Sequence, residues 1–308
     1  MNQLADAGPC TVLRHLIEGD MPQPMAGTYD ALTAMLAERA GFPIVYVSGY
    51  GISAAKLGMP DVGLLTQTEM IDTLNRVCDA VRVPVVADGD TCYGNYVNAR
   101  RLMREIEKAG AAGVHIEDQT FPKRCGHMEG KSLVPASEMA NKIKAMIDTR
   151  ADDDFVLIAR TDAIAVEGFE AAIERSERYR EAGADVIFIE APVDDYQMRE
   201  IPRRIAAPTF YNASWDGLSP LPSLTEIGEL GYRIVSYPDI VMCTAAASAH
   251  MYRSILDTGF YPEGGRMHPF RAFNQLLGLD EIDALIARYG AHGAQPVRNN
   301  LRERPGRG

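Results

Sequence analysis

The sequence predicts a single (β/α)8 barrel, an α/β fold, with a helical extension at its C-terminal end. Short apolar runs recur at intervals of about 30 residues, a helical pattern follows nearly every run, and glycine marks the end of several helices. The chain has 308 residues, and a barrel of this class takes roughly 250 of them, which leaves residues for extensions.

The eight predicted strands are unbroken apolar runs, which suit the strands of a parallel sheet that is buried on both faces. In chain order they are Gln23–Gly27, Pro43–Ser48, Val83–Asp88, Gly113–Glu117, Phe155–Arg160, Val186–Glu190, Pro208–Asn212 and Arg233–Tyr237. The first run is the weakest match to a strand.

The predicted helices follow the strands. Thr66–Val81 begins with a threonine N-cap, has Glu69 three residues later, and then carries apolar residues at helical spacing. The others are Asn95–Ala109, Ala136–Thr149, Gly168–Ala182, Tyr196–Ile205 and Leu224–Leu230. A doubly wound open sheet is the alternative, but no G-x-G-x-x-G motif follows the first strand.

No linker rich in proline, glycine or serine divides the chain, so we expect one barrel domain over residues 1–308. Its core would span about residues 20–257. The tail over residues 258–308 contains two helical patterns, Arg271–Leu277 and Asp280–Tyr289. The first dozen residues look like a loose arm.

Composition excludes several functions. The 31 basic and 42 acidic residues give a net charge of −11, which argues against binding to nucleic acid or to an anionic membrane. No apolar run is long enough for a membrane span, and the first residues lack a signal-peptide pattern. The five cysteines are scattered and form no C-x-x-C pair, which favours a reducing cytoplasm.

Polar side chains end most predicted strands, where a barrel gathers its catalytic residues. They are Ser48, Asp88, Asp90, Glu117, Asp118, Arg160, Asp162, Glu190 and Asn212. Any one of them could be a helix cap, but converging acids repel each other unless a cation neutralises them. With Asp61 from a nearby loop, the three acids Asp88, Asp90 and Glu117 form an all-oxygen set typical of Mg²⁺ or Mn²⁺. Arg160 suits a substrate carboxylate, because its planar guanidinium binds one bidentately.

The loop over residues 118–131, here called the cysteine loop, is the most unusual segment. Lys123, Arg124, Cys125 and His127 lie within five residues. A solvated basic loop with an incidental cysteine is one interpretation. The other is functional: cationic neighbours would lower the pKa of the thiol, which could then transfer a proton or attack as a nucleophile.

Several motifs, in this order and spacing, resemble the isocitrate lyase/phosphoenolpyruvate mutase superfamily over about Thr28–Leu256. They are Tyr46–Tyr50, Leu57–Gly63, Ala87–Asp90, His115–Gln119, Lys123–His127, Ala159–Asp162 and Glu190–Pro192. The Lys-Arg-Cys-Gly-His motif is typical of the lyases. The residues within these motifs are most similar to those of the branch that holds 2-methylisocitrate lyases, 2,3-dimethylmalate lyases and the petal death protein.

The resemblance implies a Mg²⁺-dependent enzyme that cleaves a carbon–carbon bond in a 2-hydroxy di- or tricarboxylate. It implies that Asp88 binds the ion while Asp61, Asp90 and Glu117 hold its waters. It also implies a barrel whose last helix is exchanged between two subunits of a tetramer.

The resemblance also implies roles for the remaining site residues. Cys125 would protonate the carbanion-like product, and Tyr46 is a candidate base, although a core tyrosine is an equally open interpretation. The other implied site residues are Ser48, Gly49, Tyr50, Lys123, Arg124, Gly126, His127, Arg160, Glu190 and Asn212.

One departure from the branch leaves the substrate open. After Asn212 these lyases usually continue with Glu-Gly-Gly or Glu-Phe-Gly, whereas this chain has Trp215 in place of the Glu. Tyr50 and Tyr93 could reshape the site as well. Oxaloacetate hydrolysis or decarboxylation and carboxyphosphonoenolpyruvate mutase-type chemistry therefore remain alternatives. A barrel kept only for binding would be expected to lose its metal carboxylates.

Overall fold

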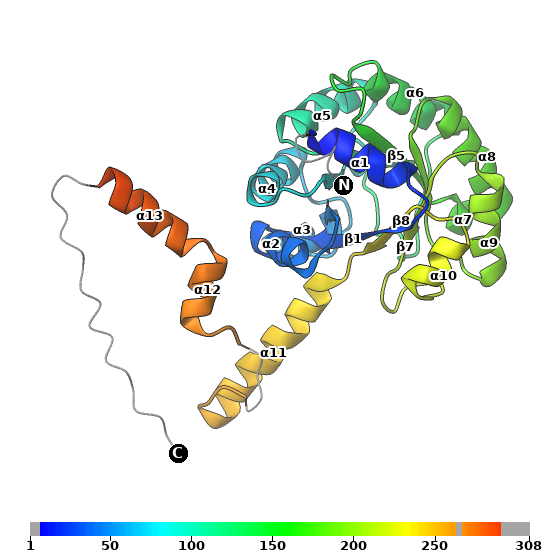
Figure 1. Cartoon of the computed structure of the whole chain (residues 1–308). Helices are drawn as coiled ribbons and strands as arrows, with labels where there is room; N and C mark the ends of the chain where they lie inside the picture. Colours follow the sequence, from blue (N-terminus) through cyan, green and yellow to red (C-terminus); the bar gives the residue numbers. More distant parts are fainter. Residues whose placement is uncertain (1–6, 263–266, 291–308) are drawn as a thin grey trace. The chain divides into compact units, whose positions relative to one another are not determined.

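The computed structural model describes residues 7–262 and 267–290. Eight parallel strands pair in sequence order, and β8 pairs with β1 to close the barrel. Helices surround the strands (Figure 1). The structure confirms the predicted (β/α)8 barrel and excludes the doubly wound open sheet.

The strands match their predicted positions to within two residues at each end. They are β1 Gln23–Thr28, β2 Ile44–Val47, β3 Val85–Asp88, β4 Gly113–Glu117, β5 Val156–Thr161, β6 Val186–Ile189, β7 Thr209–Asn212 and β8 Ile234–Tyr237. Nearly all of their residues are buried, as expected for strands between a packed barrel interior and an outer layer of helices.

All eight predicted helices are present. They are α4 Gln67–Ala80, α5 Tyr96–Lys108, α6 Ala136–Ile147, α8 Phe169–Glu181, α9 Asp195–Arg204, α10 Leu224–Glu229, α12 Phe270–Leu276 and α13 Leu279–Tyr289. Thr66 and Glu69 form the capping box that starts α4. Further helices are α1 Pro9–Glu18, α2 Ala31–Ala40, α3 Gly49–Ile52, η1 Ser53–Leu57, α7 Ala163–Val166 and α11 Ile240–Thr258.

The expectation of a loose N-terminal arm over the first dozen residues is wrong for residues 9–12, which belong to helix α1, Pro9–Glu18. Cys10, Leu13 and Ile17 lie on one buried face of this helix, at helical spacing. Arg14 donates to the carboxylate of Asp185 and to the carbonyl of Phe155, near the starts of β6 and β5. Helix α1 therefore covers the end of the barrel opposite the strand ends that carry the site.

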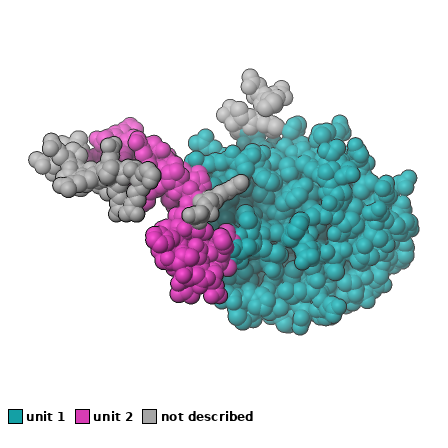
Figure 2. Space-filling view, turned by 90° about the horizontal axis from the view of Figure 1, so that it is seen from below, with its two compact units in different colours: residues 1–246 teal, residues 247–308 magenta. Residues whose placement is uncertain are grey.

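The chain divides into two compact units, residues 1–246 and residues 247–308 (Figure 2). The first holds the barrel. The second holds the end of α11 together with α12 and α13, and residues 263–266 and 291–308 of the expected tail lie outside the described residues. In the part of the chain that the structure describes, no helix is both long and apolar enough to span a membrane.

Candidate active site

A cavity of about 190 Å³ opens at the C-terminal ends of the strands. It brings together most of the predicted site residues, which are Tyr46, Ser48, Tyr50, Asp61, Asp88, Lys123, Cys125, Gly126, His127, Arg160, Glu190 and Asn212. Gly49, Asp90 and Glu117 contact lining residues from behind. Arg124 is exposed on the cysteine loop and does not line the cavity. Tyr93 does not line it either.

Asp88, at the end of β3, is fixed by neighbours on three elements. One carboxylate oxygen accepts hydrogen bonds from the Tyr46 hydroxyl and the Gly49 amide, each at 2.9 Å. The other oxygen lies 3.2 Å from Nε2 of His115, a residue that the sequence analysis missed. Burial opposes ionisation, but His115, Lys123 and the amide of Asp90 outweigh it and hold the pKa of Asp88 well below its ordinary value.

Lys123 lies between two other acids of the cluster. Its Nζ is 2.7 Å from Asp61 Oδ2 and 2.7 Å from Asp90 Oδ1, and the side chain is buried. Burial would lower the pKa of this lysine, but the surrounding acids raise it well above its ordinary value. The lysine is therefore a fixed cation within the cluster. Burial raises the pKa of Asp90 to about 6 despite this partner.

Glu117 completes the acidic cluster, here defined as Asp61, Asp88, Asp90 and Glu117. Its Oε1 is buried and has no hydrogen-bond partner among the described residues. Burial raises its pKa well above the ordinary value. Among those same residues, no three His, Cys, Asp or Glu side chains converge tightly enough to chelate an ion alone. One direct carboxylate, with neighbours that hold waters, fits Mg²⁺ better than a cage of protein ligands would.

Backbone strain marks the turn after β3. Asp90, Cys92 and Tyr93 adopt left-handed φ values of 45°, 65° and 53°, which are uncommon for residues other than glycine. Such conformations cost free energy and persist where the surrounding structure enforces them, often at functional sites. This turn therefore places the Asp90 carboxylate in the cluster at a cost in backbone energy.

Arg160, at the end of β5, is held by three acids. Its Nε and Nη2 form hydrogen bonds of 2.9 and 3.0 Å with Asp162. Its Nη1 lies 3.2 Å from Glu190 and 3.5 Å from Glu117. The guanidinium is thus aimed into the cavity by partners behind it and beside it. The sequence placed Asp162 at the end of the same strand but did not predict that it binds Arg160.

The cysteine loop passes over this arginine. A Cβ at Gly126 would lie 2.4 Å from Arg160 Nη2, so only glycine allows this approach. Lys131, which the sequence analysis also missed, donates to the carbonyl of Gly126 and to Asp162 at 3.0 Å. Its side chain is 2% exposed. Asp162 therefore binds the arginine and the loop together.

Cys125 lines the cavity, and its amide donates to the carbonyl of Asp61 at 3.0 Å. The expectation that cationic neighbours lower the pKa of this thiol is wrong. Burial raises the pKa of Cys125 to about 11, and the exposed Arg124 does not offset that. A thiol that keeps its proton suits a proton donor better than a nucleophile.

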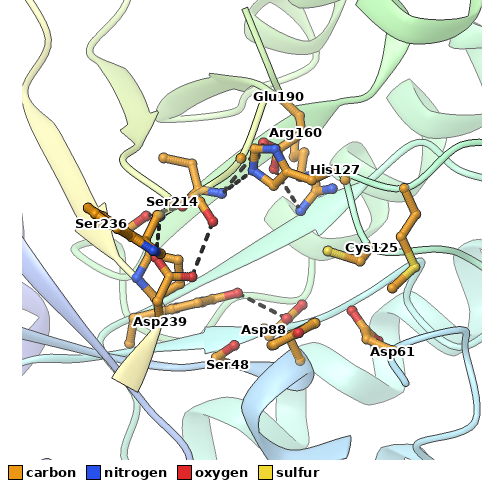
Figure 3. Close-up of a pocket in the computed structure, with 18 of the residues that line it drawn as sticks. Ser48, Asp61, Asp88, Cys125, His127, Arg160, Glu190, Ser214, Ser236 and Asp239 are labelled. Atoms are coloured by element: carbon orange, nitrogen blue, oxygen red, sulfur yellow. Dashed lines mark hydrogen bonds and ion pairs between the residues drawn. The ribbon is translucent and has the colours of Figure 1, made fainter. Parts of the chain in front are cut away.

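His127 is oriented by the loop between β7 and α10, residues 213–223, here called the β7–α10 loop. The amide of Leu218 donates to Nδ1 at 3.1 Å, so the neutral ring carries its proton on Nε2. Nε2 lies 3.4 Å from Glu190 Oε1, at the top of the cavity in Figure 3. His127 therefore presents an N–H donor rather than a lone pair.

An acidic cluster, an arginine and a cysteine loop at the mouth of a (β/α)8 barrel define a class of barrel enzymes that act on small carboxylic acids. Within this class, the chain belongs to the isocitrate lyase/phosphoenolpyruvate mutase superfamily. The family described as phosphoenolpyruvate phosphomutase matches residues 13–256.

Two relatives and one solved structure place the chain further. It is 42% identical to 2,3-dimethylmalate lyase of Eubacterium barkeri over 90% of this chain and 96% of the relative. It is also 42% identical to 2-methylisocitrate lyase of Aeropyrum pernix, over 91% and 92%. A structure of oxaloacetate acetylhydrolase with 3,3-difluorooxalacetate has a TM-score of 0.85 at 35% identity and covers 93% of this chain and 99% of that one. The chain is thus an enzyme whose relatives include lyases.

Proposed function

We propose that this protein is a Mg²⁺-dependent carbon–carbon lyase, with Mn²⁺ as a possible substitute. Its substrate is a 2-alkylmalate- or methylisocitrate-like 2-hydroxy acid, which it cleaves to a 2-oxo acid and a carboxylic acid. The observation that carries the proposal is Cys125, a thiol that keeps its proton and faces the same cavity as Asp88 and Arg160. This combination places a proton donor, a metal carboxylate and a carboxylate-binding cation around one substrate.

The acidic cluster supplies the metal site in this proposal. Asp88 would hold the ion and Asp61, Asp90 and Glu117 its waters. When bound, Mg²⁺ acts as a Lewis acid on the oxygens of the 2-oxo acid end. Ser48, Gly49 and Tyr50 stand beside this end of the substrate.

Cleavage begins with loss of the 2-hydroxyl proton. Tyr46 lines the cavity, and its hydroxyl lies 2.6 Å from His115 Nε2. Burial raises the pKa of Tyr46 well above its ordinary value, so a standing phenolate is disfavoured. In this proposal Tyr46 accepts the substrate proton while its own proton, which the hydroxyl donates to Asp88, passes into the network that Tyr46 forms with His115 and Asp88.

The alkoxide electrons then form the new carbonyl, and the C2–C3 bond breaks. Its electron pair passes to the carbon that bears the leaving carboxylate, giving an enolate-like anion. Arg160 and the Nε2–H of His127 stabilise this charge, and Cys125 gives its thiol proton to the carbon. The resulting thiolate regains a proton from the Tyr46–His115 pair or from solvent, which closes the proton balance. In this proposal the cysteine loop, whose Cys125, Gly126 and His127 line the cavity, keeps water from the anion.

A substrate panel tests the proposal. The purified protein with Mg²⁺ would be given 2-methylisocitrate, isocitrate, 2,3-dimethylmalate, other 2-alkylmalates, oxaloacetate and phosphonopyruvate, with products identified by mass. We expect a 2-oxo acid and a second carboxylic acid in equal amounts from a 2-hydroxy acid. Absence of cleavage of every 2-hydroxy acid would overturn the lyase proposal.

The second candidate is an oxaloacetate hydrolase or decarboxylase. The structural likeness to oxaloacetate acetylhydrolase favours it over unrelated chemistry. Release of oxalate plus acetate, or of pyruvate, from oxaloacetate alone would support this candidate. Conversion of phosphonopyruvate would instead point to carboxyphosphonoenolpyruvate mutase-type P–C chemistry.

We also propose that the protein assembles as a homotetramer in which the last barrel helix is exchanged between subunits. An apolar groove runs along β1, α2 and the end of β8, and includes Ala26, Leu36, Phe42 and Tyr237. Helix α11, which follows β8, has no buried residue. Light scattering after size exclusion should give four times the chain mass, and Leu256→Glu should lower it. A monomeric mass would overturn this part of the proposal.

A further inference from the structure

The two ends of the cavity differ in chemistry. Asp61 and Cys125 lie at one end, whereas Ser214 and Asp239 lie at the other (Figure 3). The latter, here called the distal end, also includes Trp215, whose amide donates to Asp239 at 2.6 Å. Met242 joins it, because its amide donates to the Asp239 carbonyl at 3.0 Å. Both of these side chains line the cavity.

The serine hydroxyl groups at the distal end already donate hydrogen bonds to other side chains. Ser214 donates to Asp239 Oδ1 at 3.1 Å, and Ser236 donates to Asn212 Oδ1 at 2.7 Å. Both serines therefore present lone pairs to the cavity. A substrate carboxylate at this end would find few donors.

Charge at the distal end also opposes an anion. Asp239 and Asp216 bring carboxylates to this part of the lining. The lysine and the arginine of the described lining are engaged elsewhere, Lys123 with Asp61 and Arg160 with Asp162 and Glu190. A carboxylate placed beside acids without a matching cation is disfavoured.

The distal end instead offers apolar surface. Trp215 is 69% exposed, a large fraction for an aromatic side chain beside a cavity, and Met242 is also exposed. Burial of such surface against a ligand is favourable in water. The wall is held in place, since Asp239 binds two successive residues of the β7–α10 loop and the Leu218 amide of that loop binds His127.

We infer that the substrate is a dicarboxylate bearing a small alkyl substituent, which packs on Trp215 and Met242 at the distal end, and that Asp239 excludes a third carboxylate there. Trp215 and Asp239 are then specificity-determining residues. This inference rests on the lyase function proposed above and narrows its substrate from di- and tricarboxylates to alkylated dicarboxylates. It follows from features of this chain's β7–α10 loop and of the residue that anchors the loop.

Steady-state kinetics test the inference. We expect kcat/KM for 2,3-dimethylmalate to exceed that for 2-methylisocitrate by at least about tenfold, the size of effect that a single pocket contact gives. Asp239→Asn keeps an acceptor for the Trp215 amide but removes the charge, and should narrow this ratio about tenfold. Trp215→Ala should lower kcat/KM for 2,3-dimethylmalate about tenfold. Tyr196→Ala, an exposed aromatic residue on α9 that lines neither the cavity nor the apolar groove, is the matched control.

Fluorescence separates this inference from the lyase proposal. Trp215 is the single tryptophan of the chain, so its emission reports on the distal end alone. The probes are 2,3-dimethylsuccinate and propane-1,2,3-tricarboxylate, which lack the hydroxyl needed for cleavage. With Mg²⁺ present, we expect 2,3-dimethylsuccinate to shift the Trp215 emission to the blue. We also expect it to bind at least about tenfold more tightly than propane-1,2,3-tricarboxylate.

The possible results distinguish failure of this inference from failure of the lyase proposal. Tighter binding of the tricarboxylate, or faster turnover of 2-methylisocitrate, would overturn the inference while leaving the lyase proposal intact. A blue shift with 2,3-dimethylsuccinate in a protein that cleaves no 2-hydroxy acid would overturn the lyase proposal and support the alkylated dicarboxylate as ligand.

Discussion

Two groups of buried acids lie side by side at the barrel mouth, and they are satisfied to different degrees. In one group, Asp118 accepts from Thr161, Tyr179, Arg175 and the amide of Asp162. Asp162 in turn accepts from Arg160 and Lys131. In the acidic cluster, by contrast, Lys123 is shared by two acids and Glu117 keeps an unpartnered oxygen.

The difference separates scaffold from binding site. Buried polar networks that are fully satisfied fix one arrangement, whereas partly satisfied ones store free energy that a ligand can release. The Asp118–Asp162 pair therefore holds Arg160 and the cysteine loop in place, whereas the acidic cluster receives the cation in the function proposed above. The predictions below test this division.

The largest expected effect is on the acidic cluster. Asp88→Ala should lower turnover by roughly 10³-fold or more, because metal binding contributes several kcal/mol to charge stabilisation. It should also abolish the Mg²⁺-dependent rise in melting temperature. Calorimetric titration with Mg²⁺ checks the second effect, and normal Mg²⁺ affinity in the variant would contradict the metal assignment.

The next effect concerns the cysteine loop, which touches both groups through the Cys125 amide and the Gly126 carbonyl. Cys125→Ser should lower turnover by about 10²- to 10⁴-fold, the usual contribution of a positioned proton donor. Oxalate should still bind with Mg²⁺, as measured by calorimetry. Unchanged turnover would remove the proton-donor role.

The contributions of Asp162 and Asp90 to the free energy of unfolding should change with pH in opposite directions. Arg160 and Lys131 overcome burial and lower the pKa of Asp162 from 3.8 to about 2. Its stabilisation is therefore present above pH 3.8 and is lost as the pH falls towards 2. Burial raises the pKa of Asp90 from 3.8 to about 6, so its contribution is present below pH 3.8 and is lost as the pH rises through 6.

The matched variants should follow these signs. At pH 7, Asp162→Asn should destabilise the protein by about 3 kcal/mol, because it breaks a buried ion pair. Asp90→Asn should stabilise the metal-free protein by about 1–3 kcal/mol, because it removes a buried charge that is costly to ionise. Urea unfolding with EDTA measures both. Destabilisation of equal size in the two variants would contradict the difference proposed between the Asp118–Asp162 pair and the acidic cluster.

The smallest effect is expected at Lys131, which acts through the loop rather than on the substrate. Lys131→Met should lower kcat about tenfold and change KM little, because misplacement of the proton donor slows chemistry more than binding. Lys131→Arg should restore part of the rate. An equal loss in both variants, accompanied by lower stability, would indicate a purely structural role.

The sequence predicted the strands and most of the site, because apolar runs and the residues that end them carry local signals. Asp88, Glu117 and Arg160 lie at the ends of strands in this way. Residues that act through long-range contacts left no such signal. His115 reads as a strand residue, and Lys131 and Asp239 read as ordinary loop charges.

Two further misses have physical causes. The pKa of Cys125 depends on burial, which its cationic sequence neighbours do not reveal. The helical spacing of Cys10, Leu13 and Ile17 is compatible with a buried helix face, but the segment is short and begins beside a glycine and a proline, so the sequence did not predict α1.

Helix α1 has a consequence for how the chain is made. Cys10 meets the carbonyl of Ala111, 101 residues later, and Arg14 meets Asp185, 171 residues later. The helix is thus synthesised long before the residues that it contacts, because Gly113 lies beside Leu13 and Asp185 binds Arg14. Contacts so distant in sequence slow folding. Docking of α1 onto the barrel therefore has to wait until the segment around Asp185 is present.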